Sequence, residues 1–275
     1  MGRKLYYMTG EEIPIVGGDP DAAKAALAGK VLIAFGDSFT VGMCEASLYG
    51  GTPPLVSLCK KYGLVLDKRG VTGSEISLNG DKPPMVSRVD TIVQDYTDGY
   101  AIGGTTYTKD DVAVITFMGG VNDGASNGII GTGLNATDLH TINGALHHIF
   151  YSLLNTFTNA KIICIAQPAH YALSASSTVT TEAAAQELGF DSVAQAQAMD
   201  NVQFSSYCCN RTQDAVKKSA LMYGVELIDM IRDMPPISIQ ANRAAYWADD
   251  KLHLTIEGYT LITNAIEKKL LDLFG

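Results

Sequence analysis

Five consecutive apolar residues followed directly by a polar turn strongly limit the folds that this chain can adopt. The apolar run at residues 31–35 ends in Gly36, Asp37 and Ser38. A short apolar run bounded by turn residues predicts a fully buried strand of a parallel sheet. Because ligands of open α/β sheets bind at the carboxyl ends of such strands, Ser38 is well placed to act as a nucleophile. On these residues alone, it is equally consistent that Asp37 and Ser38 only cap a following helix.

Four further apolar runs alternate with stretches of helical periodicity. We expect strands at residues 31–35, 64–66, 111–118, 161–166 and 225–229, a small hairpin at 96–108, and the main helices at 53–63, 85–93, 139–153, 204–223 and 256–274. This alternation predicts an α/β fold in which one parallel sheet has helices on both faces, a three-layer α/β/α sandwich. We expect a single domain over residues 1–275, with an N-terminal arm at 1–30 and an insertion at 171–200.

The acidic composition of the chain limits the partners that it is expected to bind. The formal net charge is −9 and the sequence pI is about 5.0. Such a charge repels phosphate backbones, and no basic stripe is present, so we expect no nucleic-acid partner. No apolar run approaches the roughly 20 residues that cross a bilayer, and the N-terminus has no apolar stretch of signal-peptide length, so we expect no transmembrane segment.

The cysteines indicate a reduced, cytoplasmic protein. Their number is odd and their spacing irregular: Cys44, Cys59, Cys164, Cys208 and Cys209. This pattern does not fit a disulfide framework, and no C-x-x-C pair suggests zinc. Cys59 and Cys164 lie in apolar stretches, so we expect these two to be core thiols. We expect no metal or other cofactor. The oligomeric state is left open.

Three polar loops and one segment near the C-terminus carry the residue types that acyl transfer needs. Such a reaction needs a nucleophile, a base, a group that orients the base, and donors for the developing oxyanion. Ser38 supplies the hydroxyl, His253 the base, and Asp250, three residues earlier, the orienting carboxylate. The oxyanion donors are then the backbone N–H groups of Ser38 and Gly73 and the side-chain amide of Asn122.

Two acidic residues in the same loops, Asp37 and Asp123, are candidates for contacts with the substrate. Arg88, which precedes the third strand, is a candidate contact for an anionic substrate, or it anchors a loop by ion pairing. His140, His147 and His148 lie in or beside the expected helix at 139–153. We interpret these histidines as solvated side chains, because no carboxylates stand at ligand spacing around them.

These blocks resemble, in order, those of the SGNH hydrolases, also called GDSL-type esterases and lipases. The similar segments are residues 36–40 (GDSFT), 69–74 (RGVTGS), 120–123 (GVND) and 250–253 (DKLH), followed by 257–259. Departures from the family pattern are Phe39 in place of leucine, Arg69 where asparagine is frequent, and Leu254 in place of proline after the histidine.

The resemblance implies a flavodoxin-like, five-stranded parallel sheet and a serine esterase without a cofactor. It implies a Ser38–His253–Asp250 triad, an acyl-enzyme, and an oxyanion hole from Ser38, Gly73 and Asn122. The substrate is then a small-molecule or carbohydrate-borne carboxylic ester. The polar loops at 119–135 and 171–200 favour short-chain acyl groups or acetylated sugars.

Other functions remain open at this point. A lysophospholipase, a thioesterase or an acyltransferase can use the same site, and a catalytically silent carbohydrate-binding domain can keep the same fold. A metal-dependent phosphoesterase would use Asp37, Asn122, Asp123 and His253, but it needs more ligands than the five histidines supply. As purely structural alternatives, Asp250 and His253 form a helix N-cap pair, and Asn122 and Asp123 form an Asx-turn.

Overall fold

A five-stranded sheet forms the centre of the molecule. The computed structural model describes residues 18–45, 52–80, 82–125, 128–168, 180–187, 190–198, 201–235, 239–250 and 252–275. The sheet contains β1 (Val31–Gly36), β2 (Val65–Gly70), β5 (Val112–Met118), β6 (Lys161–Ala166) and β7 (Glu226–Asp229). Its order is β2-β1-β5-β6-β7, and every neighbouring pair is parallel. The prediction of a flavodoxin-like α/β fold is therefore confirmed.

The central strand β1 carries no polar side chain because helices cover both of its faces. Along β1, Leu32 and Ala34 belong to one hydrophobic cluster, whereas Ile33 and Phe35 belong to the other. Successive strand residues point to opposite faces of a sheet, so each strand contributes to both clusters. This is the reason that β1 is buried at every position and shows no alternation of polar and apolar residues.

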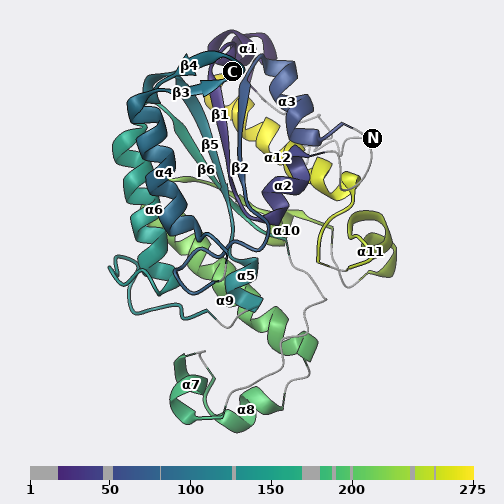
Figure 1. Ribbon diagram of the computed structural model, residues 1–275. Coiled ribbons are helices and arrows are strands. Elements are labelled where there is room, and N and C mark those ends of the chain that lie inside the picture. Colours follow the sequence, from purple (N-terminus) through teal and green to yellow (C-terminus); the bar gives the residue numbers. More distant parts are fainter. Residues whose placement is uncertain are drawn as a thin grey trace, which may run out of the picture.

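One helical layer consists of α4 (Met85–Asp98), α6 (Ile142–Thr156) and α9 (Asn201–Met222). The opposite layer contains α1 (Pro20–Leu27), α2 (Ser38–Cys44), α3 (Pro54–Tyr62), α10 (Met230–Asp233), α11 (Gln240–Tyr246) and α12 (Ile256–Phe274). Figure 1 shows α4 and α6 on one side of the sheet and α3 and α12 on the other. Among the described residues, no helix has the length and apolarity that a membrane crossing requires.

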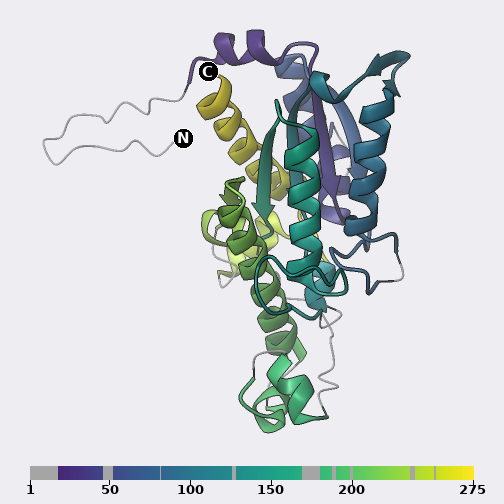
Figure 2. The same cartoon turned by 90° about the vertical axis from the view of Figure 1, so that its left-hand side faces the viewer.

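Shorter elements connect these layers. A 3₁₀ turn (Lys109–Asp111) precedes β5, and α5 (Val121–Ala125) follows it. The expected hairpin is present as β3 (Tyr100–Ile102) and β4 (Thr105–Tyr107), which pair antiparallel. In the expected insertion, α7 (Glu182–Glu187) and α8 (Val193–Gln197) lie beside the N-terminal end of α9, away from the sheet (Figures 1 and 2). Residues 171–179 of the insertion and 1–17 of the expected arm lie outside the described residues.

Some expected boundaries are wrong. The second strand continues to Gly70, although the charged run at 67–69 was expected to be a loop. This edge strand accepts charge because Arg69 pairs with Asp67 and with Asp95, each at 2.7 Å. The helix expected from residue 139 begins only at Ile142, since the Thr141 side chain caps it by accepting from the Gly144 N–H. The expected loop before Trp247 contains α10 and α11.

Candidate active site

Ser38 lies at the carboxyl end of β1, where the strand order of the sheet reverses. β1 pairs with β2 on one side and with β5 on the other, and ligands of doubly wound sheets bind at such a switch point. The chain turns into α2 directly after Gly36, where a Cβ atom would lie 2.2 Å from the Met118 carbonyl oxygen. Asp37 caps α2 by accepting from the Phe39 N–H at 3.0 Å. The cap expected from the sequence is therefore present, and it presents Ser38 as the first residue of the helix.

His253 connects Ser38 to Asp250. His253 Nε2 lies 2.8 Å from Ser38 Oγ, and His253 Nδ1 lies 2.6 Å from Asp250 Oδ2. Since an ionised carboxylate only accepts hydrogen bonds, Nδ1 carries the ring proton and Nε2 accepts from the Ser38 hydroxyl. Asp250 Oδ1 accepts from the backbone N–H groups of Leu252 and His253, at 3.0 and 2.9 Å.

These hydrogen bonds keep Asp250 charged. Desolvation acts to raise the pKa of Asp250, but the bonds from His253 and the backbone outweigh it and hold this pKa below its ordinary value. At neutral pH the carboxylate is therefore ionised and can stabilise a positive charge on the imidazole.

The loop that carries His253 is held without the proline that is common in SGNH hydrolases. Leu254, at that position, is fully buried and forms an isolated antiparallel bridge with Trp247. The Ala248 N–H donates to the His253 carbonyl at 2.9 Å, and the Phe39 and His253 rings are 5.8 Å apart. Packing and backbone hydrogen bonds thus replace the restriction that a proline would impose.

The candidate oxyanion donors come from the loops after β2 and β5. Gly73 has φ of +78°, a backbone conformation that a side chain would strain. Asn122 Nδ2 donates to the Ser74 carbonyl at 2.9 Å, which ties the amide to the residue after Gly73.

A comparison with protein families matches residues 34–261 to the model of the GDSL-like lipase/acylhydrolase family. The chain belongs to this family. The match begins within β1 and extends into α12, so it includes Ser38, Asn122 and His253. Among curated proteins, none matches the sequence at a significant level.

Solved structures share the fold of this GDSL-like family member. A protein from Lactobacillus plantarum is 21% identical with a TM-score of 0.63, covering 90% of this chain and 100% of its own. A lipase/acylhydrolase from Enterococcus faecalis is 13% identical with a TM-score of 0.51, covering 90% and 97%. An acetyl xylan esterase variant from Geobacillus stearothermophilus is 13% identical with a TM-score of 0.50, covering 89% and 95%. At these identities the likeness concerns the fold alone.

Asp37 does not line a substrate site in this GDSL-like chain. Its side chain is fully buried, and besides the Phe39 N–H it accepts from Gln167 Nε2 at 2.8 Å. Burial raises the pKa of Asp37 to about 7, against the lowering effect of these two hydrogen bonds. The expectation of a substrate contact needs correction, because both carboxylate oxygens face protein donors inside the fold.

Asp123 is also a buried acceptor. It accepts from the Ile76 N–H at 2.7 Å, the Ser77 N–H at 3.1 Å and the Ser77 hydroxyl at 3.0 Å. Burial raises its pKa, although these bonds favour the charged form. Asp123 therefore anchors the loop after β2 to α5 rather than reaching a substrate. A metal-dependent site built on Asp37 and Asp123 does not fit these contacts either, since both carboxylates are surrounded by N–H and O–H donors.

Arg88 donates hydrogen bonds to the carboxyl ends of β1 and β2 and to the loop after β2. Its Nη1 donates to the Gly36 carbonyl at 3.1 Å and to Ser74 Oγ at 3.0 Å, and its Nη2 donates to the Arg69 carbonyl. Burial lowers the pKa of Arg88 to about 10, which leaves the guanidinium charged at neutral pH. Arg88 anchors the loop after β2, as one of the two expectations had it, but through carbonyls and a hydroxyl instead of an ion pair.

The remaining histidines and the cysteines have structural surroundings. His148 Nε2 lies 2.8 Å from Asp90 Oδ1, and His147 contacts the Tyr223 hydroxyl. His140 precedes α6 and lies 3.3 Å from Asn79 Oδ1. These histidines have protein partners, so the interpretation as purely solvated side chains was incomplete. Cys59 and Cys164 are buried, which confirms the expected core thiols, and the other three cysteines are buried as well.

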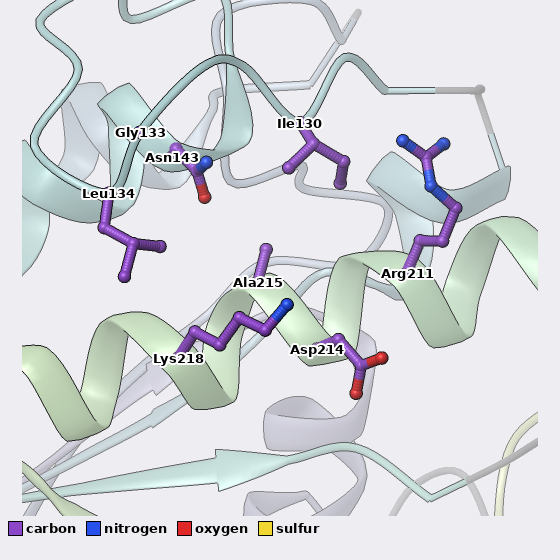
Figure 3. A pocket seen from close by; sticks show the side chains of 8 residues that line it. All are labelled: Ile130, Gly133, Leu134, Asn143, Arg211, Asp214, Ala215 and Lys218. Atoms are coloured by element: carbon purple, nitrogen blue, oxygen red, sulfur yellow. The ribbon is translucent and has the colours of Figure 1, made fainter. Parts of the chain in front are cut away.

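A separate cavity of about 370 Å³ lies between the loop after α5 and α9. In Figure 3, Ile130 and Asn143 point from the loop and from α6 towards α9, which contributes Arg211 and Lys218. None of the candidate catalytic or oxyanion residues lines this cavity. It is therefore distinct from the surface around Ser38.

Proposed function

We propose that this protein is a serine esterase that hydrolyses carboxylic esters through a Ser38–His253–Asp250 triad. The observation that carries the proposal is the pair of His253 contacts, 2.8 Å to Ser38 Oγ and 2.6 Å to Asp250 Oδ2. A serine hydroxyl is a poor nucleophile at neutral pH, and an adjacent base whose tautomer is held by a carboxylate removes this obstacle. Membership of the GDSL-like lipase/acylhydrolase family supports the same reaction class.

In the first step, Ser38 Oγ attacks the ester carbonyl carbon while its proton moves to His253 Nε2. The carbonyl π electrons move to oxygen, and the resulting oxyanion accepts from the N–H groups of Ser38 and Gly73 and the amide of Asn122. The tetrahedral intermediate collapses to an acyl-Ser38 ester, and the leaving alcohol takes the proton from His253. Water then repeats the sequence, which releases the acid and restores the Ser38 hydroxyl.

Short-chain acyl esters and acetylated carbohydrates are the favoured substrates. The support is the polar composition of the loops at 119–135 and 171–200, together with the shared fold of the acetyl xylan esterase variant. A lysophospholipase or thioesterase would use the same chemistry on another ester. An acyltransferase would replace water with a second alcohol, and a silent carbohydrate-binding domain would show no turnover.

The test is hydrolysis of p-nitrophenyl acetate, butyrate and octanoate by the wild type and by Ser38→Ala, with and without EDTA. We expect Ser38-dependent turnover that EDTA leaves unchanged and that is fastest with acetate or butyrate. Added acceptor alcohols distinguish a transferase, because they would then divert the acyl group from water. Activity that rises steadily from acetate through butyrate to octanoate would contradict the short-chain preference, since each CH₂ of the acyl chain would then contribute about 0.8 kcal/mol by burial.

Asn122→Ala is expected to lower kcat for p-nitrophenyl acetate by about 10²–10³-fold, because one donor to the oxyanion is lost. KM should change little, since the oxyanion forms only in the transition state. Steady-state kinetics measure both constants, and the midpoint of urea unfolding checks the fold. A loss confined to KM would argue against Asn122 as an oxyanion donor.

Activity is expected to fall in acid, since a protonated imidazole cannot accept the Ser38 proton. The sign follows from the role of His253 as a base, which must be neutral before each acylation. The measurement is kcat/KM for p-nitrophenyl acetate between pH 5 and 8, corrected for spontaneous hydrolysis. A profile that stays flat down to pH 5 would count against a histidine base.

A further inference from the structure

Gln167, in the loop after β6, joins the helix that begins with Ser38 to the helix that carries Asn122. Its side chain is 1% exposed. Its Nε2 donates to Asp37 Oδ2 at 2.8 Å, and its Oε1 accepts from the Val121 N–H at 2.8 Å. Gln167 belongs to none of the sequence motifs, because a glutamine after a strand has no distinctive pattern.

Each end of this connection is one residue away from a candidate catalytic group. Asp37 directly precedes Ser38 and caps α2 by accepting from the Phe39 N–H at 3.0 Å. Val121 is the first residue of α5 and directly precedes Asn122. The Gln167 carboxamide therefore connects the start of α2, which carries Ser38, to the start of α5, which carries Asn122.

A second buried glutamine, Gln213 on α9, holds the first in place. Gln213 Oε1 accepts from the Gln167 N–H at 2.8 Å, and Gln213 Nε2 donates to Gln167 Oε1 at 3.1 Å and to the Gly119 carbonyl at 3.0 Å. Because Gln167 Oε1 accepts from two donors, only one orientation of its amide satisfies both neighbours. Buried polar networks that are fully satisfied in this way are rigid.

We propose that Gln167 is a positioning residue that sets the separation between Ser38 Oγ and the Asn122 amide in the transition state. This inference rests on the proposed esterase function. Oxyanion stabilisation depends on donors that are placed before the charge develops, and a misplacement of about 1 Å can cost about 10²-fold in rate. Gln167 does not touch the substrate and acts only through Asp37 and Val121.

The experiment compares wild type, Gln167→Met, Asn122→Ala and the double variant, with p-nitrophenyl acetate as substrate. Methionine keeps the length of the side chain but removes its three hydrogen bonds, to Asp37, Val121 and the Gln213 side chain. We expect Gln167→Met to lower kcat by about 10–100-fold with KM within about twofold. In the double variant, kcat should stay within about threefold of Asn122→Ala alone, because the spacing no longer matters once the donor is gone.

The control is Thr116→Val on β5. Thr116 is 1% exposed, and the described part of the chain shows no hydrogen-bond partner for its hydroxyl. This variant removes a buried polar group from the same sheet without touching the network, so kcat should match that of the wild type. The NMR shift of the Val121 amide proton reports separately whether the bond to Gln167 is broken.

An unchanged kcat in Gln167→Met with a displaced Val121 resonance would overturn the proposal, as would fully additive losses in the double variant. If Gln167→Met does not fold, Gln213→Met is used instead; it removes the support of Gln167 while leaving the bonds to Asp37 and Val121. A smaller but equally non-additive loss of kcat is then expected, and an additive loss would overturn the proposal.

The failure of the proposed function can be told apart from the failure of this inference. If wild type shows no Ser38-dependent hydrolysis, the rate at which diisopropyl fluorophosphate phosphorylates Ser38 replaces kcat. That reaction needs the nucleophile and the oxyanion donors but no particular ester. A slower reaction in Gln167→Met than in Thr116→Val supports the positioning role, and equal rates would overturn it.

Discussion

Ser38→Ala is expected to lower kcat for p-nitrophenyl acetate by about 10⁴–10⁶-fold, the largest effect of any single substitution in this chain. Without Oγ no acyl-enzyme forms, and only the residual effect of the oxyanion donors on attack by water remains. The burst of p-nitrophenol that reports acyl-enzyme formation should disappear as well. Stopped-flow and steady-state absorbance at the p-nitrophenolate band measure both quantities.

The matched control is Ser57→Ala, which removes the hydroxyl of an exposed serine on α3. It should retain wild-type kcat, and both variants should unfold at nearly the same urea concentration as the wild type, since each loses a single oxygen atom. Equal activity of Ser38→Ala and the wild type would contradict the serine mechanism. It would leave a binding domain, or an enzyme whose nucleophile lies elsewhere.

Asp250→Asn is expected to lower kcat by about 10⁴-fold while leaving the fold intact. In the wild type, Asp250 Oδ1 accepts hydrogen bonds from the backbone N–H groups of Leu252 and His253 at 3.0 and 2.9 Å. Asparagine keeps an oxygen atom that can accept both. It presents an N–H group to His253 Nδ1, however, so that the ring proton moves to Nε2. A protonated Nε2 cannot accept the proton of Ser38, and the charge that would stabilise an imidazolium is also lost.

Asp249→Asn provides the neighbouring control. Asp249 is exposed, as is Asp250, and it carries the same charge one residue earlier on the same loop. A general effect of lowering the negative charge would appear in both variants, whereas loss of the imidazole tautomer appears only in Asp250→Asn. If the two variants have equal kcat, Asp250 does not orient the base.

The fold could be predicted from the sequence because its signals are local. The apolar runs that became β1, β5 and β6 are continuous, and a strand buried on both faces needs no other pattern. The charged edge strand β2 was cut short in the prediction, because nothing near Arg69 in the sequence indicates that Asp95, on α4, neutralises it. Tertiary pairing overrode the local propensity there.

For the candidate site too, the sequence indicates the chemical groups but not the directions in which they point. The residue types in the motifs at 36–38, 122–123 and 250–253 indicated a nucleophile, an oxyanion donor and a base, but they placed both Ser38 and its neighbour Asp37 on the side of the substrate. The structure separates them by direction, because Ser38 Oγ lies 2.8 Å from His253 Nε2 whereas the Asp37 carboxylate faces Gln167. A motif that contains both residues does not indicate which of the two side chains is buried and which faces the histidine.

Local patterns along the chain are enough to indicate the succession of the main strands and helices and the chemical groups at the ends of β1 and β5. Which of these groups meet depends on the three-dimensional packing, since Ser38 and His253 are 215 residues apart along the chain. The same packing places Arg88 and Gln167 where they hold the neighbouring loops by hydrogen bonds. Hydrogen bonds between residues distant in sequence depend on how the sheet and its two helical layers pack, and no local pattern contains that information.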